Sequence, residues 1–127
     1  MKKGELSGNW KVEKTDVKVQ LPVMVFLEDK AHIAYIPVLD LSGYGNSEKE
    51  ALDSLDIVLN DYFSYGIRKK TLLDDLKAHG WKIEKKSKPY IAPDITDILN
   101  KNEYLHDIVN SRPYKMDRID VNMPQLA

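Results

Sequence analysis

The stretch YIPVLDLSGYGNSEKEAL, residues 35–52, marks the point where a strand pattern gives way to a helix pattern. Pro37 ends the strand that precedes it, because proline has no N–H to donate to a neighbouring strand. Residues 38–44 predict a third short strand with its leucines on one face. Ser47 and Glu50 have the spacing of a capping box, which begins a helix. The stretch therefore predicts two strand segments followed directly by a helix.

Upstream of this stretch the sequence predicts a β-hairpin. Residues 16–27 are rich in valine and alternate in part, which is typical of a long strand. Pro22 is expected at an edge or a bulge of that strand, because it cannot take part in a full hydrogen-bond ladder. Residues 28–30 form a polar tip, and residues 31–37 resume an apolar, β-rich pattern.

Downstream of it, apolar residues recur at helical spacing and predict a long helix that ends near Gly66. The apolar stripe consists of Ala51, Leu52, Leu55, Val58, Leu59, Tyr62 and Phe63. A second, shorter helix is expected between Thr71, a candidate cap, and Gly80, which suits the position after a helix end. Residues 81–84 alternate apolar and charged side chains and predict a fourth strand. The charged run 85–89 marks a predicted boundary.

The remainder of the chain is predicted to form a separate arm. We expect a first domain of residues 1–88 and an arm of residues 89–127 made of helix and strand. Residues 94–109 predict one helix or two short ones, and residues 117–124 predict a final strand. That strand either returns to the sheet or pairs with a second copy of the chain. The expected fold class is α+β: a small β-β-β-α-(α)-β sheet packed by one long helix, plus the arm.

The composition is that of a soluble globular protein. Of 127 residues, 43% are hydrophobic and 31% are charged, and 19 basic against 20 acidic residues give a net charge of −1. The overall charge therefore gives no reason to expect general binding to nucleic acid. The absence of cysteine excludes disulfides, thiolate nucleophiles and Cys-ligated zinc. The longest apolar run, residues 21–27, is far shorter than the roughly 20 residues of a membrane helix, so we expect a cytoplasmic protein.

No sequence motif points to catalysis or to a cofactor. His32, His79 and His106 do not have metal-ligand spacing. The glycines at residues 43–45 match no phosphate-binding loop and favour a tight strand-to-helix turn over an anion site. A hydrolase of ribonuclease-H type needs several converging acids, and the third strand offers only Asp40. We therefore predict a protein that is not an enzyme and has no cofactor or metal ion.

The predicted long helix has an acidic outer face. The acidic residues are Glu48, Asp53, Asp56 and Asp61, against the single Lys49. Such a face is either a solvated exterior or a docking surface for a basic partner, because opposite potentials speed encounter. We predict these four acids as the partner-binding residues.

Basic residues gather in short clusters that are not interleaved with aromatic residues. The candidates for contact with RNA or DNA are Lys69, Lys70, Lys85, Lys86 and Arg118. A solvated rim is the simpler interpretation of such clusters. A regulatory protein that binds nucleic acid is the alternative function.

Residues 35–52 also resemble the signature of HicB-like antitoxins. In that family an aromatic-rich hairpin ends in proline, a short glycine-containing strand follows, and a helix begins at Ser/Thr-x-x-Glu-Ala. The residues in register with this pattern are Pro37, Gly43, Gly45, Ser47, Glu50 and Ala51. The likeness covers about residues 17–84.

This resemblance implies a fold and a partner. The fold would be similar to a trimmed ribonuclease-H-like or double-stranded-RNA-binding-like sheet, without catalysis of its own. The partner would be a small basic toxin of HicA type, an mRNA-cleaving ribonuclease whose active surface the antitoxin covers. Many such antitoxins also carry a C-terminal ribbon-helix-helix or helix-turn-helix domain that binds promoter DNA.

The C-terminal strand departs from that pattern. Residues 118–124 look like the strand of a ribbon-helix-helix unit, but the two helices that should follow are missing. Asp120 would also be repelled by DNA phosphates. We therefore expect the segment to act as a dimerising strand, in which Ile119, Val121 and Met123 contact a second copy in a homodimer or a higher homo-oligomer.

Overall fold

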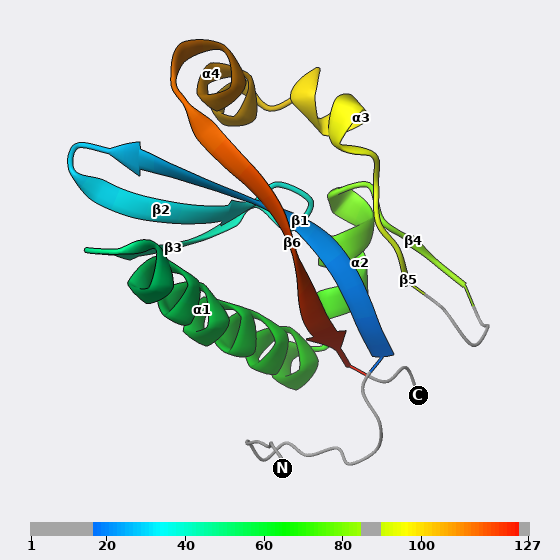
Figure 1. Cartoon of the computed structure of the whole chain (residues 1–127). Coiled ribbons are helices and arrows are strands. Elements are labelled where there is room, and N and C mark those ends of the chain that lie inside the picture. The colour runs from blue at the N-terminus through cyan, green and yellow to red at the C-terminus, as the bar shows by residue number, and fades with distance from the viewer. Residues whose placement is uncertain (1–16, 85–89, 125–127) are drawn as a thin grey trace.

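The computed structural model describes residues 17–84 and 90–124 and confirms the predicted mixed α+β class. A four-stranded antiparallel sheet has the strand order β3-β2-β1-β6, and a second sheet pairs β4 with β5 (Figure 1). In chain order the elements are β1 (Val17–Glu28), β2 (Ala31–Ile36), β3 (Leu41–Gly45), α1 (Glu48–Lys69), α2 (Leu72–Ala78), β4 (Lys82–Ile83), β5 (Tyr90–Ile91), α3 (Ile95–Leu99), α4 (Glu103–Ser111) and β6 (Tyr114–Met123).

The predicted hairpin is present as β1 and β2, and its polar tip is a two-residue turn. Glu28 pairs with Ala31 across the hairpin, so Asp29 and Lys30 alone make the connection. Both have positive φ, 51° for Asp29 and 72° for Lys30. This is the backbone of a type I′ turn, which matches the twist of the two strands and favours Asn-Gly at its centre. Aspartate adopts positive φ more readily than lysine, so the backbone strain of this turn lies mainly at Lys30.

Replacing Lys30 with glycine should raise the free energy of unfolding by about 0.5–1 kcal/mol, because glycine adopts positive φ without steric cost. Urea denaturation measures this change as a higher midpoint with an unchanged slope. The matched control is Lys30→Ala, which removes the charge but keeps the strain. An equal gain from alanine would assign the effect to the charge and contradict the backbone explanation.

Pro22 lies in the half of β1 that has one neighbour. The pairing of β1 with β2 spans Met24 to Glu28, whereas the pairing with β6 continues through Pro22 to Val17. Pro22 therefore lies at an edge of β1 among the described strands, as predicted, where its missing N–H leaves no partner unsatisfied.

The long helix begins where the capping box predicts and ends later than expected. The Glu50 N–H donates to Ser47 Oγ at 3.1 Å, and the Asn46 N–H donates to Glu50 Oε1 at 2.9 Å. The predicted end near Gly66 is wrong, because α1 continues to Lys69. Gly66 is instead a close-contact position: a Cβ there would lie 2.9 Å from the Cβ of Leu72 in α2. The glycine allows α2 to pack against α1.

Both faces of the main sheet are covered by helices, α1 on one face and α4 on the other (Figure 1). Alternation along β1 explains this: Leu21 and Val23 belong to the core under α1, and Met24 and Phe26 to the core under α4. The α4 side of that second core supplies Leu105 and Ile108, which are 1% and 0% exposed. The predicted separate arm after residue 88 is thus corrected: α4 is a layer of the same domain.

The final strand returns to the sheet of its own chain. β6 pairs antiparallel with β1 over the whole register from Val17↔Met123 to Phe26↔Tyr114. Val121 and Met123 are buried in the core, and Ile119 packs against it. The prediction that these side chains contact a second copy is therefore wrong for the intact sheet. No described strand pairs with the outer edge of β6, so a homodimer through that backbone edge stays a prediction.

The expected fourth strand, residues 81–84, does not join the main sheet. It is present as β4, which pairs only with β5 among the described strands. The position beside β1 is filled by β6, whose ladder is far longer than anything β4 could form. The short sheet is fixed by two aromatic anchors: Trp81 Nε1 donates to Val38 O at 2.7 Å, and Tyr90 OH donates to Pro124 O at 2.6 Å. Burial raises the pKa of Tyr90 to about 12, so its hydroxyl remains a donor at neutral pH.

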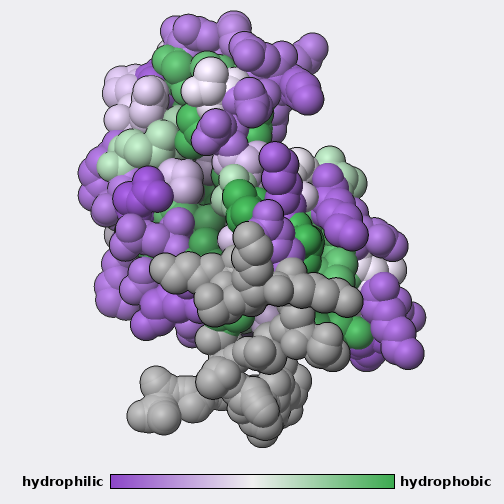
Figure 2. All heavy atoms as spheres, turned by 90° about the vertical axis from the view of Figure 1, so that its right-hand side faces the viewer, coloured by the Kyte–Doolittle hydropathy of each residue, from purple (hydrophilic) through white to green (hydrophobic). Residues whose placement is uncertain are grey.

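The side of the molecule formed by α2, α3 and the short sheet is mainly hydrophilic, with separate hydrophobic patches between the polar side chains (Figure 2). The large apolar residues exposed on these elements are Leu73 and Ile91, at 38% and 41%. Such scattered exposure is normal for a globular surface. None of the described helices combines the length and apolar character that a membrane span requires.

Candidate functional site

Two surfaces of the described chain carry acidic residues together with exposed apolar or aromatic side chains. The first, the α1 outer face, consists of Asp53, Asp56, Ile57 and Asp61. These residues follow one another at three-, one- and four-residue steps and are all exposed to solvent. Ile57 is 63% exposed in the midst of the carboxylates. The α1 outer face thus combines one exposed apolar side chain with three carboxylates.

The four acids predicted as partner-binding residues are not equivalent in the structure. Asp56 and Asp61 are exposed and have no ion-pair partner among the described residues. The carboxylate of Asp53 is 2.8 Å from Lys49 Nζ. Glu48 is turned toward β6, where its carboxylate lies 2.6 Å from Lys115 Nζ. The available negative charge on this face therefore comes mainly from Asp56 and Asp61.

The second surface is the β2–β3 groove, a hollow of about 480 Å³ on the side of the sheet that α4 partly covers. It is lined by Glu28, Asp29, Ala31, Ile33, Tyr35, Asp40, Ser42, Tyr44 and Tyr104. The floor of the groove is formed by alternate residues of the two strands, because every second side chain of β2 and of β3 points to this face. The turn after β1 supplies one end of the groove and the turn after β2 the other, so acidic residues lie at both ends.

Tyr35 fixes the floor of the groove. Its side chain is 1% exposed, its OH donates to Asp40 Oδ1 at 2.7 Å, and it accepts from Asn102 Nδ2 at 3.0 Å. Burial, and to a lesser degree the Asp40 carboxylate, raises the pKa of Tyr35 well above its usual value, so the hydroxyl stays protonated. Asp40 has a positive φ of 56°, and its N–H donates to Ile36 O at 2.8 Å. The phenol therefore ties the turn after β2 to the start of α4.

Two further tyrosines form the walls. Tyr104 of α4 meets Tyr35 edge-on, with 5.1 Å between ring centroids and 83° between planes, and remains 38% exposed. Burial, followed by the negative charge of Glu28, raises the pKa of Tyr104. Tyr44 of β3 is 63% exposed. One wall of the groove is thus packed in place, and the other presents an open aromatic ring.

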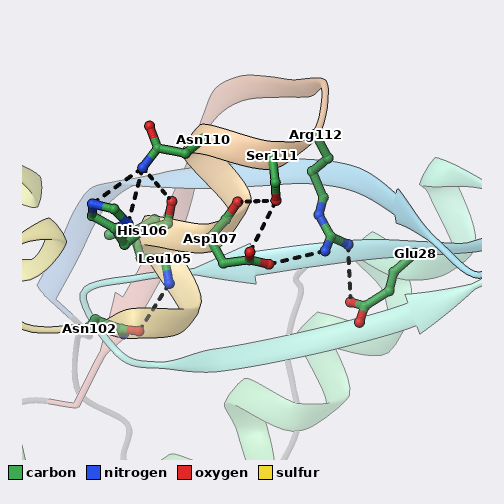
Figure 3. A network of polar contacts seen from close by, with 8 residues as sticks. All are labelled: Glu28, Asn102, Leu105, His106, Asp107, Asn110, Ser111 and Arg112. Carbon is green, nitrogen blue, oxygen red and sulfur yellow. Dashed lines mark hydrogen bonds and ion pairs between the residues drawn. The ribbon is translucent and has the colours of Figure 1, made fainter.

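Arg112 links the C-terminal end of α4 to the end of β1 (Figure 3). Arg112 lies 3.2 Å from the carboxylate of Asp107 and 3.7 Å from that of Glu28, and its guanidinium sits 5.7 Å from the ring centroid of Phe26. Its Nε is buried and has no hydrogen-bond partner among the described residues. At the other end of the helix, Asn102 Oδ1 accepts from the Leu105 N–H at 3.0 Å. These contacts fix α4, and with it the Tyr104 wall.

The predicted basic residues lie on different elements. Lys69 and Lys70 are exposed at the end of α1, and Arg118 of β6 donates from Nε to Gln20 Oε1 at 3.3 Å. Lys85 and Lys86 lie outside the described residues. The hypothesis that these cations contact nucleic acid stays a prediction.

Within residues 17–84 and 90–124, no group of three or more histidine or acidic side chains is placed to hold a metal ion. Asp40, the acid considered for a hydrolase, accepts a hydrogen bond from Tyr35.

Sequence reasoning missed the groove and Ile57. Ile57 interrupts the polar side of the helical pattern, and that signal was present in the sequence. The groove had no local signal, because it brings together Tyr35 and Tyr104 from β2 and α4.

The fold and these surfaces define a small α+β protein in which a four-stranded antiparallel sheet lies between helices, with exposed acidic residues on α1 and on the β2–β3 side. Comparison with known proteins finds no matching family model, no matching curated protein and no matching solved structure.

Proposed function

We propose that this protein is a HicB-like antitoxin or a stand-alone relative of one, which binds a small basic ribonuclease of HicA type in the cytoplasm and covers its active surface. The observation that carries the proposal is the α1 outer face, where exposed Ile57 lies among Asp56 and Asp61. The resemblance of residues 35–52 to the HicB-like signature names the class of partner.

The chemistry of this face suits a basic protein. Two carboxylates without ion-pair partners among the described residues attract a positive surface and orient it during encounter. Ile57 supplies apolar area, which is lost from water when the partner covers it. Because the carboxylates are exposed, their contribution is screened by salt and acts mainly on the association rate.

The test is capture of the small basic protein encoded beside this chain, followed by affinity measurement with the double variant Asp56→Lys/Asp61→Lys. We expect a complex at least about tenfold weaker, because the variant places positive charge against a positive surface. Asp74→Lys is the matched control, since Asp74 is an exposed acid on α2. The proposal is contradicted if the wild-type chain binds no such neighbour, or if the α1 variant and the α2 variant bind equally well.

A further inference from the structure

We propose that the β2–β3 groove binds a basic side chain, arginine or lysine, presented by a protein partner. The inference deepens the proposed function and rests on it for the identity of that partner as a basic protein. It concerns a different surface from the α1 outer face, on the side of the sheet that α4 partly covers.

The charged residues that line the groove are all acidic. Three carboxylates line it, from Glu28, Asp29 and Asp40, and none of the described lining residues is lysine or arginine. The negative charge of Glu28 is partly neutralised by Arg112, whose guanidinium lies 3.7 Å away. Asp29 and Asp40 are exposed and have no ion-pair partner among the described residues. Their charges lie near opposite ends of the groove, so a cation in it is attracted from both sides.

The aromatic side chains suit the same ligand. Tyr44 is 63% exposed and lines the groove with an open ring. Tyr104 offers a second, partly exposed ring. A guanidinium or ammonium group is attracted to the face of such rings, and a guanidinium also stacks on them with its planar surface. Carboxylates with aromatic walls thus favour a cation that carries an apolar stem, which is the chemistry of arginine and lysine side chains.

The floor and one wall of the groove have fixed positions. Tyr35 is held between Asp40 and Asn102, and Tyr104 packs on Tyr35. Binding to a preformed site avoids the cost of ordering these side chains. A volume of about 480 Å³ is ample for one long side chain together with part of its backbone.

The test is an NMR titration of the full chain with N-acetyl-arginine amide, in which the ring signals of Tyr44 and Tyr104 are followed. We expect saturable shifts of both. N-acetyl-citrulline amide has nearly the same shape without the charge and should not produce saturable shifts. Equal shifts from the two probes, or none from the arginine probe, would overturn the inference.

The matched variant is Asp29→Asn/Asp40→Asn. Both positions have positive φ, which asparagine tolerates well, and the amide oxygen introduced at position 40 can still accept from the Tyr35 hydroxyl. The two turns are therefore retained while two charges are removed. We expect a loss of affinity for the arginine probe of at least about fivefold, and Asp74→Asn should cause none. A change of less than about twofold in the groove variant contradicts the proposal.

The same variants separate this inference from the proposed function. If the arginine probe binds and no basic neighbour is captured, the groove site stands and the antitoxin proposal fails. If a basic neighbour binds to the wild type and to the groove variant equally, and the arginine probe fails, the antitoxin proposal stands and the groove site fails. If both are right, the groove variant weakens the protein complex as well as probe binding.

Discussion

Replacing Gly43 with alanine should lower the free energy of unfolding by about 3 kcal/mol, one of the two largest effects expected for a single substitution here. A Cβ at this position of β3 would lie 2.3 Å from Leu55 N and 2.4 Å from Ala51 O, both backbone atoms of α1. Backbone cannot move aside as a flexible side chain can, so the whole helix must shift away from the sheet. The expected result is a clearly lower urea midpoint in equilibrium denaturation.

The control for Gly43→Ala is Ser42→Ala, the neighbouring residue of β3, whose side chain points to the opposite face. We expect a change of less than about 1 kcal/mol there. A Gly43→Ala protein as stable as the wild type would mean that α1 does not approach β3 as closely as the structure shows.

Replacing Ile108 of α4 with alanine should lower the free energy of unfolding by about 3 kcal/mol, because the side chain is fully buried between α4 and the sheet and its loss leaves a cavity. The substitution also decides between a separate arm and an integral layer. If α4 is a layer of one domain, the variant unfolds in a single transition whose midpoint lies at a lower urea concentration than that of the wild type. Different spectroscopic probes should then give the same midpoint.

Ile57→Ala is the matched control, since it makes the same chemical change at a residue of α1 that is 63% exposed. Its effect should stay within about 0.5 kcal/mol. A second transition in Ile108→Ala, with residues 17–84 unfolding at the wild-type midpoint, would support a separate arm and contradict the observed packing of α4 on the sheet.

The features that the sequence predicted correctly depend on neighbours close along the chain. The β1–β2 hairpin needs two alternating runs and a short polar tip, and the start of α1 needs Ser47 and Glu50 three residues apart. The exposed acids of α1 followed from helical spacing alone. Each of these is set by local geometry, which the order of residues encodes directly.

The features that it missed depend on contacts between distant segments. A glycine such as Gly66 is typical of a helix end, but here it lies inside α1, where the absence of a side chain leaves room for Leu72. The groove requires α4 to lie over β2, as the bond between Asn102 and Tyr35, 67 residues apart in sequence, shows. No local pattern encodes such a meeting, so the candidate site was only half predictable: the carboxylates of α1 were found and the groove was not.

The sequence by itself determined where most of the strands and helices lie, how α1 begins, and which of its residues face solvent. Only the tertiary structure decided which strand lies beside β1 and what covers the second face of the sheet. The edge of a strand pairs through main-chain hydrogen bonds, so the pattern of side chains does not say which segment pairs with it. The ten residues of β6 pair with β1 from Val17 to Phe26, whereas the two residues of β4 pair with β5. The apolar side chains of β1 that point away from α1 then require a second cover, which α4 supplies.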